Sequence, residues 1–123
     1  MAAVHSEDTR PEMAVRKIVH GLGYRYRLHV RTLPGRPDLV FPAKCKIVFV
    51  HGCFWHRHGK CRYATSPKTR RKFWGAKFAA NVARDRRIVR ELKRMGWAVF
   101  TVWQCELKKP ARLTGRLNDF LSN

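Results

Sequence analysis

Apolar positions near the N-terminus follow the spacing of a helix. The run Thr9-Arg10-Pro11-Glu12 is typical of a helix start, with a threonine cap, a proline in the first turn and a glutamate at the capping-box position. Gly21 and Gly23 mark its end. The stripe consists of Met13, Val15, Ile18, Val19 and Leu22. The pattern therefore predicts a first helix between Thr9 and about Gly21.

Strand-like patterns occupy the next part of the chain. Aromatic and basic residues alternate over residues 24–30, which predicts an exposed strand. Residues 33–38, LPGRPD, form a turn signal. Residues 39–41 then predict a short strand and residues 46–51 a buried strand, before an irregular stretch over residues 52–68.

Helical and strand patterns alternate again in the last part of the chain. A long helix is predicted over residues 69–95, ending at Gly96, and a buried strand over residues 98–103. Pro110 opens a last helix, with leucines and a phenylalanine spaced to pack. The order predicts an α/β fold with a mixed central sheet flanked by helices, in one domain over residues 1–123.

The charge of the chain points to a polyanionic partner. Lys and Arg number 27 against 8 Asp and Glu, which gives a net charge of +19. The basic residues run through the whole chain, so they favour a charged face on a folded domain and hence nucleic acid over a membrane surface. The N-terminus lacks the apolar core of a signal peptide, so we expect a cytoplasmic protein. Its four cysteines should then stay reduced or bind metal. We also expect the protein to be a monomer.

Three residues in the irregular stretch have the spacing of zinc ligands. Cys53, His58 and Cys61 form C-x4-H-x2-C, and thiolates with imidazole are the preferred ligands of tetrahedral zinc. Cys105 follows a buried strand and is the best candidate for a fourth ligand. The alternative is a set of scattered small apolar cysteines, which is our interpretation of Cys45.

Several acidic and imidazole groups suggest metal-dependent phosphodiester chemistry. Asp38 directly precedes a strand, a place where nucleases carry the carboxylate that holds Mg²⁺, although a turn residue gives the same dipeptide. His51 and His56 flank the zinc motif and could transfer protons or stabilise charge, or could be ordinary loop histidines. Glu12 could support the site or only complete the capping box.

Aromatic and polar residues suggest contacts with DNA bases. Phe54 and Trp55 stand at a loop tip in a very basic protein, which suits a wedge between base pairs, or they form a small core over the zinc. Trp74, Lys77 and Asn81 share one face of the long helix. Stacking by the tryptophan with base contacts from the other two is one interpretation, and ordinary packing beside solvated polar residues is the other.

These segments together resemble a known family of DNA repair enzymes, the very short patch repair (Vsr) mismatch endonucleases. The resemblance runs in order through LPGRPDLVF, KIVFVHGCFWHRHGKC, FWGAKFAANVARDRR and ELKRMGWAVFTVWQCEL, over about residues 8–107. It implies a restriction-endonuclease-like core with a structural zinc site. It also implies Mg²⁺-dependent nicking of one strand, 5′ to the thymine of a T:G mismatch in double-stranded DNA, with mismatch-repair proteins as possible partners.

The resemblance also implies roles for individual residues. Matched onto this sequence, the family's functional residues are Asp38 and the Val50 carbonyl for Mg²⁺, Glu12, His51 and His56 for catalysis, Cys53, His58, Cys61 and Cys105 for Zn²⁺, and Phe54, Trp55, Trp74, Lys77 and Asn81 for DNA. The chain departs from the family at Val50, where members can carry threonine, and in a shortened N-terminal extension. The rival hypotheses are a module that binds distorted DNA without cutting and a nickase with another target.

Overall fold

One mixed three-stranded sheet organises the protein, which is described here from a computed structural model covering residues 9–28, 30–53 and 69–123. The sheet order is β1-β2-β3, with β1 antiparallel to β2 and β2 parallel to β3. The mixed sheet and helices predicted from the sequence are thus confirmed. The helices and strands are α1 (Arg10–Gly21), β1 (Leu39–Phe41), β2 (Lys46–His51), α2 (Arg71–Arg94), β3 (Ala98–Trp103) and α3 (Pro110–Ser122), with 3-10 turns η1 (Pro42–Lys44) and η2 (Gln104–Lys108).

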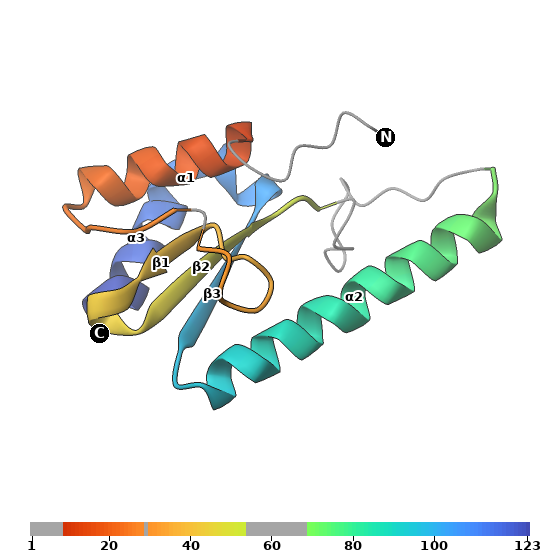
Figure 1. The fold of residues 1–123 in the computed structure, drawn as a ribbon. Coiled ribbons are helices and arrows are strands. Elements are labelled where there is room, and N and C mark those ends of the chain that lie inside the picture. Colours follow the sequence, from red (N-terminus) through yellow and green to blue (C-terminus); the bar gives the residue numbers. More distant parts are fainter. Residues whose placement is uncertain (1–8, 29, 54–68) are drawn as a thin grey trace.

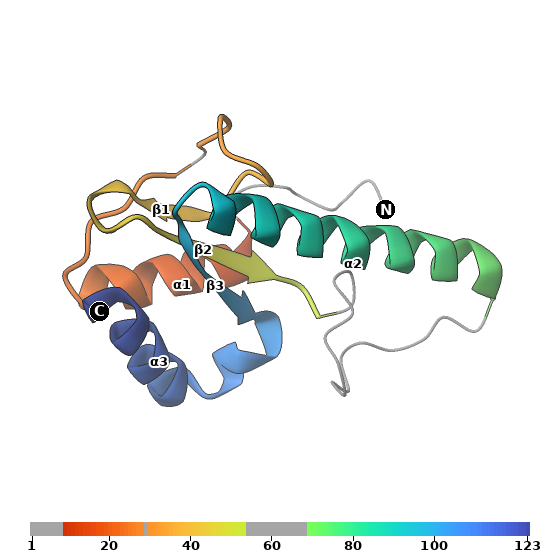
Figure 2. The same cartoon turned by 90° about the horizontal axis from the view of Figure 1, so that it is seen from below.

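Helices cover both faces of the sheet. Helices α1 and α3 lie together on one face, and α2 lies on the other (Figure 1). The N-terminal half of α2 extends well beyond the sheet in both views (Figures 1 and 2). Within the part of the chain that the structure describes, no helix is both long and apolar enough to cross a membrane.

The alternation of side chains along the strands divides the core into two parts. Val48 and Val102 face α1 and α3, whereas Ile47 and Phe49 face α2. The larger part of the core is made by Val15, Val19, Leu39, Phe41, Val48, Val102, Leu113, Leu117 and Leu121. Because both faces of β2 are covered, the strand is apolar along most of its length, as expected for a strand buried on both faces.

Lys46, at the start of β2, is the exception to this apolar pattern. Its side chain is buried, and its ammonium group donates hydrogen bonds to the carbonyl oxygens of Phe120 and Asn123 at the end of α3. These carbonyls have no partner within the helix, and a cation near a helix C-terminus also interacts favourably with the helix dipole. The lysine therefore joins the beginning of β2 to the last turn of α3.

Helix α1 begins as predicted, with Thr9 as its N-cap. The Thr9 hydroxyl accepts a hydrogen bond from the backbone N–H of Glu12, at 3.4 Å. One member of the predicted apolar stripe was wrong: Met13 is exposed at the surface. Val15 and Val19 define the buried face, and Met13 lies outside it because it is two residues before Val15, about 200° away around the helix.

The strand predicted over residues 24–30 is replaced by a single bridge. Arg27 pairs with Val40 through two backbone hydrogen bonds, of 2.8 and 3.0 Å. Its partner β1 is only three residues long, with Pro37 shortly before it and Pro42 directly after it. Proline cannot donate to a ladder, so β1 offers the segment little length for pairing.

The turn that leads into β1 packs against α2. Gly35 has a φ of +76°, and a Cβ atom built on it would lie 2.5 Å from Cγ2 of Ile88. Glycine is therefore required here both by the backbone conformation and by the approach of α2. The contact fixes the turn three residues before Asp38, the first of the candidate site residues.

Candidate functional site

Asp38 is held where β1 and β2 come together. It directly precedes β1, after the buried Pro37. Its Oδ2 atom accepts a hydrogen bond from the backbone N–H of Val50, at 2.6 Å. A hydrogen bond of this length limits the rotation of the carboxyl group. The half-buried carboxyl is thereby fixed at the end of β2, beside His51.

Glu12 reaches the same place from the first turn of α1. The residue is 6% exposed, and its side chain is hydrogen-bonded to Asp38. It also forms an ion pair with Arg16, in which Oε2 lies 3.5 Å from Nη2. The backbone of Glu12 therefore takes part in the helix cap, whereas its carboxyl belongs to the site. The backbone N–H of Glu12 bonds to Thr9, but its side chain contacts Arg16 and Asp38 and does not complete the capping box, so the purely local interpretation of this side chain was wrong.

Burial and the neighbouring Glu12 carboxyl perturb the pKa of Asp38. The pKa of Asp38 is raised from 3.8 to about 8, chiefly because burial disfavours its charged form. The hydrogen bond from Val50 opposes this rise in the pKa, whereas the hydrogen bond and the negative charge of Glu12 add to it, and the positive charge of Arg16 lowers it. Near neutral pH the metal-free pair thus holds a proton, and a bound cation would take the place of that proton.

This pair of carboxyls suits a hard divalent cation. Mg²⁺ is commonly bound through one or two carboxylates and keeps several water molecules. Asp38 and Glu12 supply oxygen ligands of this kind on two different elements. Among the described residues no three His, Cys, Asp or Glu side chains gather in one metal-binding group. Any further ligands would be water, a backbone carbonyl or residues outside the described ranges.

His51 ends β2 next to the carboxyl pair, and aromatic neighbours contact its imidazole. The ring of Trp103 meets it edge to face, with centroids 5.4 Å apart, and the ring of Phe49 lies 5.5 Å away. The first contact follows from the sheet register, which pairs His51 with Trp103 across the parallel strands. The imidazole is thus held by packing at the edge of the sheet that carries Asp38. The second predicted histidine, His56, lies outside the described residues.

Two of the four predicted zinc ligands leave the sheet at the same edge. Cys53 is 1% exposed and Cys105 is half-buried. Cys53 lies two residues after His51, and Cys105 lies two residues after Trp103. Because His51 and Trp103 are paired across parallel strands, both cysteines leave the sheet at the same end of these strands. Cys45 precedes β2, at the other end of the strand, and is exposed, so its interpretation as a small apolar core cysteine was wrong. His58 and Cys61 lie outside the described residues.

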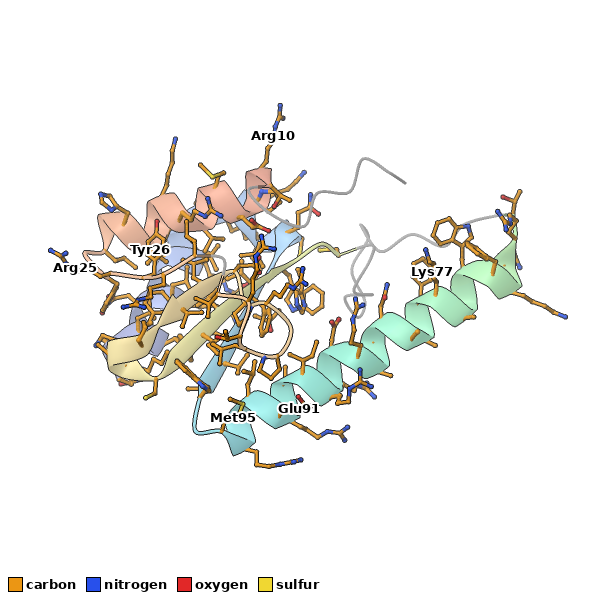
Figure 3. The ribbon with its side chains drawn as sticks, viewed as in Figure 1. Arg10, Arg25, Tyr26, Lys77, Glu91 and Met95 are labelled. Atoms are coloured by element: carbon orange, nitrogen blue, oxygen red, sulfur yellow. The ribbon has the colours of Figure 1, made fainter. Side chains whose placement is uncertain are left out.

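The long helix α2 carries the remaining candidates for DNA contact that the structure describes. Trp74 is half-buried and stacks on Phe78, with centroids 5.8 Å apart. Lys77 is exposed on the N-terminal half of the helix, far from Met95 at its other end (Figure 3). Asn81 accepts a hydrogen bond from Arg84, at 3.4 Å. Phe54 and Trp55, the predicted wedge, lie outside the described residues.

Exposed basic residues cover α2 along its whole length. Such a surface attracts the phosphates of nucleic acid. The exposed basic residues of this helix are Arg71, Lys72, Lys77, Arg84, Arg86, Arg87, Arg90, Lys93 and Arg94.

Sequence reasoning missed two residues that contact the candidate site. Arg16 pairs with Glu12, and Trp103 packs on His51. The spacing of Arg16, four residues after Glu12, was a signal for a helical ion pair, but nothing in the sequence showed that this pair would be buried. The contact of Trp103 depends on strand register, which becomes visible only in the folded chain.

Comparison with known proteins gives consistent results. Residues 1–62 match the family model described as DNA mismatch endonuclease Vsr. The chain is 51% identical to the type II nicking enzyme V.XorIIP of Xanthomonas oryzae, over 98% of this chain and 88% of the relative. It is 40% identical to the DNA mismatch endonuclease Vsr of Escherichia coli, over 93% of this chain and 72% of the relative.

The fold has a counterpart among solved structures. The catalytic domain of the homing endonuclease I-Bth0305I matches with a TM-score of 0.65 and 21% identity, over 92% of this chain and 94% of that domain. At this level of identity the match supports the fold, while the sequence relatives support the activity. The chain belongs to the Vsr family of DNA mismatch endonucleases and is an endonuclease that acts on DNA.

Proposed function

We propose that this endonuclease uses Mg²⁺ to nick one DNA strand on the 5′ side of the thymine in a T:G mismatch. The observation that carries the proposal is the contact between Asp38 and Glu12, two carboxyls from different elements at the end of β2. Family membership adds the mismatch, because one relative is named a DNA mismatch endonuclease. Oxygen ligands, a basic surface and a nearby imidazole are the features that metal-assisted phosphodiester cleavage requires.

The carboxyl pair would hold the metal together with the backbone carbonyl of Val50. Bound Mg²⁺ would polarise the phosphate and lower the pKa of a water molecule. Asp38 is the primary ligand in this proposal, and Glu12 is the supporting carboxyl beside it. The N–H of Val50 fixes the other side of the Asp38 carboxyl, so both neighbours limit its rotation.

The histidines would handle protons and charge. Hydrolysis needs a proton removed from the attacking water and a proton or positive charge at the departing oxygen. In this proposal His51 takes one of these tasks, and the rings of Trp103 and Phe49 pack against its imidazole at the end of β2. His56 takes the other task in this proposal.

Zinc would have a structural role in the same region. Three thiolates and one imidazole close a tetrahedral site and leave no position for a reacting water. Cys53 and Cys105 follow neighbouring parallel strands at the same end of the sheet, which supports this proposal. His58 and Cys61 complete the proposed ligand set. The metal would join the end of β2 to the end of β3, next to His51.

DNA binding would combine phosphate contacts with base stacking. The basic surface of α2 supports the phosphate contacts. Phe54, Trp55 and Trp74 are proposed to unstack the mismatched step, which costs less than unstacking a matched one. The ring of Trp74 stacks on Phe78, so in this proposal it either leaves Phe78 or stacks on a base while keeping that contact. Lys77 and Asn81 are proposed to contact base edges.

The test of the site is a strand-nicking assay with a variant that removes one charge. Asp38→Asn should abolish Mg²⁺-dependent nicking of a T:G duplex while leaving DNA binding in place. Asp119→Asn is the matched control, because this aspartate is exposed on α3 and should tolerate the same chemical change. Full activity in Asp38→Asn would refute the metal site. Nicking of other mismatches or paired DNA at the same rate would instead indicate a nickase with a different target.

A further inference from the structure

Arg16 lies behind the carboxyl pair, in the second turn of α1. Its side chain is only 11% exposed, and that of its partner Glu12 is 7% exposed. The distance from Nη2 of Arg16 to Oε2 of Glu12 is 3.5 Å. A second guanidinium nitrogen, Nη1, donates to Sδ of Met13 at 3.0 Å. The guanidinium is thus held between the surface methionine and the site glutamate.

Burial makes this ion pair different from the usual pair along a helix. Exposed pairs four residues apart contribute little to stability, so their loss has little effect. Removing one partner of a buried pair leaves a charge without compensation, and this is strongly unfavourable. Glu12 additionally contacts Asp38, and its side chain is buried in a low-polarity environment. Arg16 is a cation on the same helix that offsets the cost of burying this carboxylate.

A backbone N–H at the start of α1 competes with Arg16 for the Glu12 carboxylate. Glutamate at the third residue of a helix commonly folds back to the N–H of the capping residue, which here is Thr9. Arg16 lies one turn further along, so its ion pair draws the carboxylate in the opposite direction. The same carboxylate contacts Asp38.

We infer that Arg16 is a positioning residue of the metal-binding carboxyl pair, which it serves by holding the Glu12 carboxylate against Asp38. The inference rests on the proposed function, because it assigns a purpose to the site proposed to bind Mg²⁺. Arg16 acts through Glu12 and takes no part in the reaction itself.

The experiment compares Arg16→Gln, Arg16→Lys and a matched control, Lys17→Gln, in the full chain. Lys17 is the next residue along α1 and is exposed, so its substitution removes the same charge without touching the ion pair. Mn²⁺, which accepts the same oxygen ligands as Mg²⁺, is the probe, and its affinity is measured by calorimetry without DNA. If Arg16→Gln does not fold, Arg16→Met replaces it, because an apolar chain of similar length suits the buried position.

Arg16→Gln should weaken Mn²⁺ binding about 10- to 100-fold, the range found for residues that orient metal ligands. Arg16→Lys should restore most of the affinity, and Lys17→Gln should match the wild type. In nicking assays the Mg²⁺ concentration for half-maximal rate should rise in Arg16→Gln, while the KM for DNA stays unchanged. A merely structural role would lower the melting temperature without changing the affinity for Mn²⁺, and that result would overturn the inference. An equal loss in Lys17→Gln would also overturn it.

A crystal structure of metal-free Arg16→Gln separates this inference from the proposed function. The Glu12 carboxylate should leave Asp38 in the variant. If it stays in place, Arg16 does not position it and the inference fails, whatever the metal data. If wild-type protein binds no Mn²⁺, the proposed metal chemistry fails, and the position of Glu12 in the variant crystal still decides whether Arg16 holds it.

Discussion

Binding of a divalent cation at Asp38 should release a proton. Burial raises the pKa of Asp38 from 3.8 to about 8, and the contact with Glu12 adds to the rise. At pH 6.5 the metal-free carboxyl is therefore protonated, and a cation that binds it must displace close to one proton. The apparent affinity for the cation should then rise roughly tenfold per pH unit up to about pH 8 and level off above it.

Calorimetry with Mn²⁺ measures this linkage directly. Titrations at one pH in buffers of different ionisation enthalpy give the number of protons released, and titrations from pH 5.5 to 8.5 give the slope of affinity. Asp38→Asn should remove both the binding and the proton release. An affinity that is independent of pH, with no proton released at pH 6.5, would show that Asp38 is already ionised in the metal-free protein. The argument from burial would then be wrong.

The same shift predicts how the stability of the metal-free protein depends on pH. The folded pKa lies above the unfolded value of 3.8, so the folded state retains a proton that the unfolded chain loses. The stabilising effect is therefore complete below about pH 4 and is lost as pH rises towards 8, with a slope of at most about 1.4 kcal/mol per pH unit. Urea unfolding of wild type and Asp38→Asn should differ by this slope. Parallel curves would contradict the assignment.

Three further predictions concern the turn, the zinc and the wedge. Gly35→Ala should destabilise the protein by about 1–3 kcal/mol in urea unfolding, because its Cβ would overlap Ile88. The double variant with Ile88→Ala should lose less than the sum of the single losses, and strict additivity would exclude the contact. Metal analysis of protein purified without chelator should find one zinc per chain, and its absence would refute the site at Cys53. Replacing Phe54 and Trp55 by alanine should reduce the preference for mismatched over matched DNA, whereas equal losses on both duplexes would argue against a wedge.

Local signals were sufficient to predict most of the secondary structure. The threonine cap and proline at the start of α1 and the apolar runs of β2 and β3 mark their elements within the sequence itself. The alternation over residues 24–30 is equally clear, and yet the described part of this segment, residues 24–28 and 30, pairs only through the bridge at Arg27. Strand pairing depends on the partner, and β1 is too short and too closely flanked by prolines to extend it.

The candidate site was predictable residue by residue, but its internal contacts were not. The sequence singled out Asp38 and Glu12 separately and left a purely local role open for each. Their contact joins residues 26 positions apart and depends on how α1 packs against the sheet. The burial of Arg16 depends on the same packing, so the sequence alone showed only a helical spacing. Long-range packing of this kind accounts for the part that sequence patterns could not supply.

The central claim is that the enzyme nicks DNA at a T:G mismatch with Mg²⁺. The most direct test is the single-turnover nicking rate on two duplexes that differ only at one pair, T:G against C:G, with each strand labelled separately. We expect a single nick in the thymine strand, immediately 5′ to the mismatched thymine, only with Mg²⁺ and only in the T:G duplex. Equal cleavage of the matched duplex, cleavage of both strands, or nicking that persists in excess chelator would contradict it.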